Sequence, residues 1–328
     1  YDAPRAAFAA DLDNDGILDV VAVGADDRLR MWRNGRLDPF VDDPRATALG
    51  PCVGATAADL DADGAVDLVL VRPDGEVALA RGAGRGAFAL VPNVPTRRVG
   101  ARAVAATDVD GDGHLDLVAT DATEGVLSIV LSDRHGGFLA RLTYPAGTSP
   151  SALVVARIDA DTIPDVLVTD EATGELLLLI GLGGGTFDLP ITTPVGAAPV
   201  ALVVGDWNGD GFLDVATANE VSGDVTTLQG DGVGGFGART DLPVGTTPAE
   251  LAVRDFDADG VLDLVVCASG DGHVVLFEGV GDGSFLAGFA HDAGSAPHCV
   301  ASADFDGDGR LDLALADPVD GKVSILLG

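Results

Sequence analysis

The chain has 328 residues, of which 47% are hydrophobic, and its formal net charge is −33, from 52 acidic and 19 basic residues. This hydrophobic content excludes a disordered chain, and the length allows a large buried core. The negative charge argues against nucleic-acid and anionic-membrane partners, because phosphate groups require a positive surface.

The cysteines, the apolar runs and the N-terminal residues contain no motif that predicts a chemical function. Cys52, Cys267 and Cys299 are widely spaced and form no CxxC pair, so we expect core or loop packing rather than disulfides or zinc. No apolar run approaches the ~18 residues of a membrane-spanning helix, so no membrane insertion is expected. The chain begins at Tyr1 without a signal peptide, which indicates a processed or excised part of a longer product.

An acidic nine-residue segment of the form DxDxDGxxD recurs along the chain. In chain order its copies begin at Asp11, Asp59, Asp108, Arg157, Asp206, Asp255 and Asp304. Their closing aspartates are separated by 48 residues once and by 49 residues five times. A phenylalanine recurs at nearly the same spacing, at Phe40, Phe88, Phe138, Phe187, Phe236 and Phe285. Seven units of about 49 residues predict a single repeat domain over residues 1–328.

The fifth unit shows the expected strands in chain order. Ala201–Gly205 precedes the acidic segment and Leu213–Ala218 follows it. Asp224–Leu228 and a run beginning at Phe236 come after turns rich in Gly, Asn and Ser. Short β-branched runs separated by such turns are strands rather than helices. The sequence therefore predicts an all-β fold, a seven-bladed β-propeller of four-stranded antiparallel blades.

The last blade should lack its outer strand. Seven units of 49 residues would fill 343 positions, whereas the chain has 328. The seventh aromatic residue would fall near position 334, and Tyr1–Ala3 is too short to replace that strand. The alternative is that the missing strand was removed with flanking sequence.

The acidic segments have the composition of calcium-binding loops. Calcium prefers six to eight oxygen ligands, and the loop offers carboxylates at positions 1, 3, 5 and 9 and a carbonyl at position 7. A glycine at position 6 allows the positive φ of a sharp turn. Position 12 lacks the glutamate of an EF-hand, and strands rather than helices flank the loop. The predicted ligands are Asp11, Asp13, Asp15, Ile17, Asp19; Asp59, Asp61, Asp63, Ala65, Asp67; Asp108, Asp110, Asp112, His114, Asp116; Asp206, Asn208, Asp210, Phe212, Asp214; Asp255, Asp257, Asp259, Val261, Asp263; and Asp304, Asp306, Asp308, Arg310, Asp312.

The fourth loop, Arg157–Asp165, should hold no ion, so we expect about six Ca²⁺ in all. Arg157 replaces the first ligand, Thr162 replaces the turn glycine, and Pro164 stiffens the next residue. We expect the guanidinium of Arg157 to neutralise a loop carboxylate such as Asp159.

On these loops, together with the GGF motif at 136–138 and GGFG at 234–237, the chain resembles the FG-GAP (VCBS-type) repeat family. That family includes the integrin α-subunit propeller, bacterial surface proteins and a fungal propeller lectin. The resemblance covers essentially the whole chain. It implies that the acidic loop joins the first two strands of a blade and binds calcium. It specifies no ligand, because one scaffold serves many functions.

Three classes of function remain open: a module recognising glycans or extracellular proteins, a structural propeller of a larger surface protein, and a polysaccharide lyase-like enzyme. We favour non-catalytic recognition by a monomer or a domain of a larger protein. Calcium loops indicate a secreted, periplasmic or cell-surface location. A cationic group opposite the calcium face could bind an anion, and its residues are Arg5, Arg97, Arg98, Arg102 and His298. Trp32 should pack between sheets rather than form a sugar platform.

Overall fold

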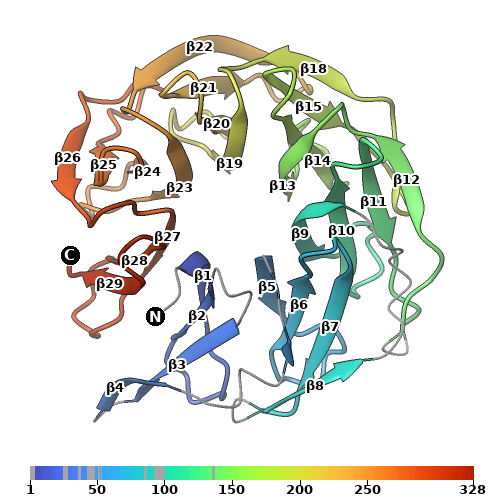
Figure 1. Cartoon of the computed structure of the whole chain (residues 1–328). Helices are drawn as coiled ribbons and strands as arrows, with labels where there is room; N and C mark the ends of the chain where they lie inside the picture. The colour runs from blue at the N-terminus through green and yellow to red at the C-terminus, as the bar shows by residue number, and fades with distance from the viewer. Residues whose placement is uncertain are drawn as a thin grey trace.

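The computed structural model describes residues 4–24, 29–35, 38–42, 49–50, 52, 54–84, 87–91, 100–134 and 137–328. These residues form seven antiparallel sheets arranged as blades around a central axis (Figure 1). The predicted all-β, seven-bladed propeller is thus confirmed. In the described part of the chain no helix is long and apolar enough to cross a membrane.

Each blade runs outward from the axis in sequence order, so its first strand is innermost (Figure 1). Blades 1 to 3 contain β1 (Pro4–Ala10), β2 (Asp19–Gly24), β3 (Leu29–Gly35), β4 (Asp38–Asp42); β5 (Gly54–Ala58), β6 (Asp67–Val71), β7 (Val77–Gly82), β8 (Phe88–Val91); and β9 (Ala101–Thr107), β10 (Asp116–Asp121), β11 (Val126–Val130), β12 (Leu142–Pro145). Blade 4 contains β13 (Pro150–Ala156), β14 (Asp165–Asp170), β15 (Glu175–Leu179), β18 (Ile191–Pro194), and a small hairpin of β16 (Gly181–Gly183) and β17 (Thr186–Phe187). Blades 5 to 7 contain β19 (Pro199–Gly205), β20 (Asp214–Asn219), β21 (Asp224–Gly230), β22 (Phe236–Pro243); β23 (Pro248–Arg254), β24 (Asp263–Ala268), β25 (His273–Phe277), β26 (Phe289–Asp292); and β27 (Cys299–Ala303), β28 (Asp312–Asp317), β29 (Lys322–Leu326).

The core lies between the blades. The second strands β6, β10, β14, β20 and β24 are buried at every residue, because neighbouring blades cover both of their faces. This explains their nearly continuous apolar sequences, such as DLVLV and DLVVCA. The inner strands crowd the axis, which requires small residues such as those of GATAA in β5.

Blade 7 has three strands in the described chain, β27, β28 and β29, so the predicted absence of its outer strand is confirmed. The ring closes by packing, since β1 of blade 1 lies beside β27 and β28 of blade 7 (Figure 1). Trp32 packs in this junction with Ala316 and Val323. It therefore occupies the sheet-packing position that we expected.

Candidate metal sites and the opposite face

The acidic loops join the first and second strands of each blade. In blade 3 the closing Asp116 pairs with Thr107 at the end of β9, so Asp108 and the following seven residues form the hairpin loop. The same register recurs in the other six blades. This repeated register places all seven loops at the same end of the ring.

Loop 3, Asp108–Asp116, shows the hydrogen bonds shared by the intact loops. The Oδ1 and Oδ2 atoms of Asp108 accept the N–H groups of Asp112 at 3.1 Å and Gly113 at 2.9 Å. Asp112 Oδ1 accepts the N–H of His114 at 2.8 Å. Gly113 has the expected positive φ of 87°. These bonds hold the carboxylates of positions 1 and 5 in place within a tight turn.

Position 4 also has a positive φ in all seven loops, a requirement that we did not predict. Its residues are Asn14, Ala62, Gly111, Ala160, Gly209, Ala258 and Gly307. The signal was present in the sequence, since four of these residues are Asn or Gly, which adopt this conformation at little cost.

Five loops bring three carboxylates together. In each, one oxygen from each of three aspartates lies within 4.8 Å of the others, and these groups could hold a metal ion. They are Asp11, Asp13, Asp15; Asp59, Asp61, Asp67; Asp108, Asp110, Asp116; Asp255, Asp257, Asp259; and Asp304, Asp306, Asp308. In loop 5 the amide oxygen of Asn208 accepts the N–H of Asp210 at 2.9 Å, as Asp110 does for Asp112 in loop 3.

The electrostatics of these groups favour a cation. Burial raises the pKa of Asp110, and the like charges of Asp112 and Asp108 raise it further. Desolvation also raises the pKa of Asp257, with Asp259 adding to the effect. A hard cation would remove this repulsion, and the all-oxygen donor set is the one that Ca²⁺ prefers.

Loop 4 differs from the others in the way that the sequence indicates. Thr162 does not have the positive φ of the turn glycines, and Asp159, Asp161 and Asp165 form no three-carboxylate group of the kind found in five other loops. The expected neutralisation by Arg157 is wrong. Arg157 is exposed, and no ion pair joins it to another described residue within 4.0 Å. The substitution therefore removes a carboxylate without supplying an internal cation.

Arginines instead reach loops 2 and 3, from the end of β7 and from the turn after β11. Arg81 Nη1 forms an ion pair with Asp67 and lies 3.4 Å from Asp61. Arg134 forms an ion pair with Asp112. Against the opposing effect of desolvation, the N–H of His114 and then this arginine lower the pKa of Asp112. A metal ion in loop 2 would share Asp61 and Asp67 with Arg81. These contacts could not be predicted, because 14 and 22 residues separate the partners in the chain.

The closing aspartate has a structural role in addition to its predicted metal role. Asp116 is buried, and its Oδ2 accepts the N–H of Val109 in the loop at 3.0 Å. Its Oδ1 accepts the N–H of Ser132, just after the third strand, at 2.7 Å. The same pair of bonds is formed by Asp67, Asp165, Asp214, Asp263 and Asp312. The sequence contained a signal for this role, because the degraded fourth copy of the loop retains its closing aspartate, Asp165.

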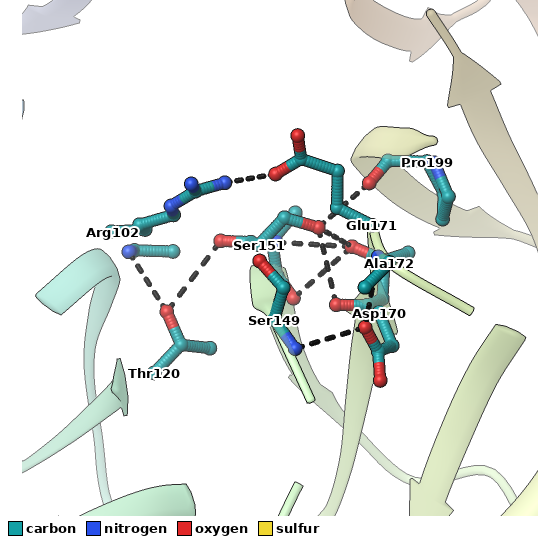
Figure 2. Close-up of polar contacts among 11 residues, drawn as sticks. Arg102, Thr120, Ser149, Ser151, Asp170, Glu171, Ala172 and Pro199 are labelled. Atoms are coloured by element: carbon teal, nitrogen blue, oxygen red, sulfur yellow. Dashed lines mark hydrogen bonds and ion pairs between the residues drawn. The ribbon is translucent and has the colours of Figure 1, made fainter. Parts of the chain in front are cut away.

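A second set of buried aspartates fixes the opposite face. Asp170, at the end of β14, accepts N–H groups from Ser149 at 3.0 Å and Ala172 at 3.0 Å (Figure 2). It also accepts the N–H of Thr148 at 2.6 Å. Burial alone would raise the pKa of Asp170, but these bonds hold it below its usual value. Asp317 is held in the same way in blade 7. We did not single out these residues in the sequence.

Of the predicted cationic group, the structure describes the side chains of two members, Arg102 and His298. Arg102, in β9, forms an ion pair with Glu171, which links blade 3 to blade 4 (Figure 2). His298 is exposed and immediately precedes β27 in blade 7, so two blades separate it from Arg102 on one side of the ring and three on the other. Arg97 and Arg98 lie outside the described residues, and so does the side chain of Arg5 in β1.

The central channel contains a cavity of about 520 Å³. Its wall includes Val154, Val203 and Ala301, with Arg254 as its charged member.

A carboxyl group lies on β23, the inner strand that also carries Arg254. Burial raises the pKa of this residue, Glu250, to about 7. The other six blades carry Ala, Gly or Cys at this position of the repeat. Among the seven inner strands, that of blade 6 alone has a carboxyl side chain at this position of the repeat.

Six overlapping segments of the chain match the model of the FG-GAP-like repeat: residues 11–70, 59–119, 108–168, 157–217, 206–266 and 255–315. The chain therefore belongs to the FG-GAP-like repeat family. No curated protein sequence is significantly similar to it.

Several solved propellers have a similar fold at low sequence identity. An Agrocybe aegerita lectin that recognises non-reducing terminal N-acetylglucosamine is 18% identical, with a TM-score of 0.65 over 94% of this chain and 84% of the lectin. BBS1N, solved in complex with ARL6DN, is 16% identical, with a TM-score of 0.69 over 100% and 93%. Virginiamycin B lyase from Staphylococcus aureus is 14% identical, with a TM-score of 0.64 over 99% and 95%. At these identities the likeness shows the fold alone.

Asp165→Ala should destabilise the protein by about 3 kcal/mol, because two buried N–H groups, of Ile158 and Gly181, lose a charged acceptor. The number of bound metal ions should not change, since the groups that could hold an ion lie in the other loops. Urea denaturation and metal analysis measure both effects. Asp161→Ala, an exposed change in the same loop, is the control and should cost less than 1 kcal/mol. Equal losses from the two variants would contradict the structural role.

Glu250 should make stability depend on pH. The pKa of Glu250 in the folded protein, about 7, lies above the ordinary value of 4.5. The contribution of protonated Glu250 to the free energy of unfolding is therefore complete below pH 4.5 and is lost as the pH rises through 7. Glu250→Gln should therefore gain stability relative to the native protein between pH 5 and pH 8, by up to about 3 kcal/mol. Urea midpoints at both pH values measure the difference, with the exposed Glu220→Gln as control. A difference that stays constant with pH would refute the assignment.

Proposed function

We propose that this chain is a calcium-loaded, non-catalytic recognition module. The calcium part rests on one observation, the five groups of three aspartate oxygens within 4.8 Å. In each loop the carbonyl at position 7 and water would complete the six to eight ligands that calcium prefers. Loop 5 is included because Asn208 supplies an oxygen at position 3. Six ions would change the formal charge from −33 to about −21, since each carries two positive charges.

The recognition part is supported by repetition of one surface. Six blades carry the same loop at the same end of the ring, so a ligand that binds weakly to one blade could be bound at several. The lectin and BBS1N structures are propellers whose descriptions name a glycan and a protein partner. We therefore infer a glycan or an extracellular protein as the ligand. Calcium loading favours a secreted, periplasmic or cell-surface location. We infer that the chain acts there as a monomer or as a domain of a larger surface protein.

The alternative is a polysaccharide lyase-like enzyme, and virginiamycin B lyase is an example of an enzyme with a similar propeller fold. A polysaccharide lyase would release unsaturated products from an acidic polysaccharide. Their appearance on incubation with the protein, and their absence with heat-inactivated protein, would replace the recognition proposal with an enzymatic one.

Calcium should bind with a stoichiometry of six, measured by metal analysis after equilibrium dialysis. Asp255→Asn, in loop 6, should lower it to five, whereas the matched Asp159→Asn in loop 4 should leave six. Chelation should lower the melting temperature, because a site at 100 times its dissociation constant stabilises the fold by about 2.7 kcal/mol. Seven ions in the native protein, or a melting temperature unchanged after confirmed metal removal, would contradict the proposal.

A glycan array probed in calcium, and again with chelator, tests the recognition part. We expect binding to a restricted set of glycans, among them acidic or amino sugars, and loss of that binding on chelation. Calcium binding with silence across the array would reject glycan recognition while leaving the metal assignment intact.

A further inference from the structure

Arg81, at the end of β7, places a positive charge inside loop 2. Its Nη1 atom donates to Oδ2 of the closing Asp67 and lies 3.4 Å from Oδ2 of Asp61. The side chain of Arg81 is 16% exposed and that of Asp67 is 1% exposed, so dissolved salt screens this pair weakly. Asp61 and Asp67 are two of the three aspartates in the candidate metal group of loop 2, and Asp59 is the third. The guanidinium therefore contacts two of the carboxylates that a metal ion in this loop would need.

The arginine at loop 3 has a different position. Arg134 pairs with Asp112, which is not a member of the three-carboxylate group of loop 3, namely Asp108, Asp110 and Asp116. The side chain of Arg134 is 61% exposed, and exposed ion pairs contribute little to stability. Arg134 therefore leaves the carboxylates of that group to a metal ion.

Most blades have no cation at the position of Arg81. This residue directly precedes Gly82, whose N–H donates to the closing Asp67 at 2.7 Å. Blade 1 has Arg33 at this position, and its side chain lies outside the described residues. In blades 3 to 7 the residues that precede the corresponding donors are Leu131, Ile180, Gln229, Glu278 and Leu327.

Loop 6 is the matched counterpart of loop 2. Both loops have the sequence pattern DxDADGxxD, and each contains a three-carboxylate group. Blade 6 has the exposed Glu278 where blade 2 has Arg81. The two loops thus share their acidic residues and differ in the charge of the side chain at this position.

A positive charge at this place has opposite effects with and without a metal ion. Without metal, the guanidinium offsets the repulsion among the carboxylates of loop 2. A calcium ion that entered the loop would either meet the like charge of Arg81 at short range or displace the guanidinium from Asp61 and Asp67. Both routes lower the affinity of loop 2 for calcium.

We propose that Arg81 is the resident cation of loop 2, which stabilises this loop without metal and makes it bind calcium more weakly than loop 6. The inference rests on the proposed calcium loading of the chain and assigns one of its sites a lower affinity. As free calcium falls, loop 2 releases its ion before loop 6 does, and Arg81 then holds Asp61 and Asp67 in place. Two loops of the same sequence pattern thus respond to different calcium concentrations.

Equilibrium dialysis of the full chain over a range of free calcium concentrations tests the proposal. Asp61→Asn and Asp257→Asn each remove the carboxylate of position 3, from loops 2 and 6 respectively. Compared with the native protein, Asp61→Asn should lose a weakly bound ion and Asp257→Asn a tightly bound one, with midpoints at least tenfold apart. Arg81→Leu, which introduces the residue type of blade 3, should shift the weak midpoint to at least tenfold lower calcium. Arg239→Leu removes the same charge from an exposed ion pair on β22, and it should leave both midpoints unchanged.

Thermal melting separates the role of resident cation from simple packing. In chelator, Arg81→Leu should melt at a lower temperature than the native protein, because Asp61 and Asp67 lose their cationic partner. In saturating calcium this difference should shrink, since the ion takes over that role. A difference of equal size in both conditions would overturn the proposal.

The dialysis outcomes distinguish this inference from the calcium loading itself. Equal midpoints for the ions lost in Asp61→Asn and Asp257→Asn, or an Arg81→Leu isotherm identical to the native one, would overturn the role of Arg81 and leave calcium loading intact. Absence of calcium uptake by the native protein would reject the calcium loading, and the inference with it.

Discussion

The carboxylate at the end of each acidic loop is the constraint on which the blades depend. Asp116 and its counterparts are almost completely buried, which would be costly for a charged group without partners. Each accepts one N–H from its loop and, where the end of the third strand is described, a second N–H from there. One side chain thus fixes the turn between the first two strands and joins it to the third. This explains why Asp165 remains in a loop that has lost the first carboxylate and the turn glycine.

Acidic residues have different surroundings on the two faces of the ring. On the loop face, the carboxylates at positions 1 and 3 lie close to that of position 5 in three loops and to that of position 9 in two, and their repulsion is left for a cation to remove. On the opposite face, Asp170 and Asp317 are satisfied by backbone N–H groups, which lower their pKa values. The loop face therefore keeps a repulsion that a cation could remove, whereas these two carboxylates of the opposite face already have backbone partners.

The two junctions of blade 7 are built by different strands. Blade 1 packs directly on β27 and β28, and Trp32 fills this junction. On the other side of blade 7, the cavity beside Phe256 and the unpaired edge of β29 retain the geometry of a complete blade. The ring closes through the inner strands β1, β27 and the second strand β28, whereas the cavity lies beside β29.

The sequence by itself determined the number of blades, the position of the loops and the three-stranded last blade. These features follow from a constant spacing and from local turn chemistry, which need no knowledge of distant contacts. Only the tertiary structure decided the partners of long charged side chains. Arg81 and Arg134 reach carboxylates of loops 2 and 3, and Arg102 reaches Glu171 of the next blade, whereas Arg157 extends into solvent. A guanidinium at the end of a flexible stem can reach several carboxylates in so acidic a protein, and the packing of the blades selects among them.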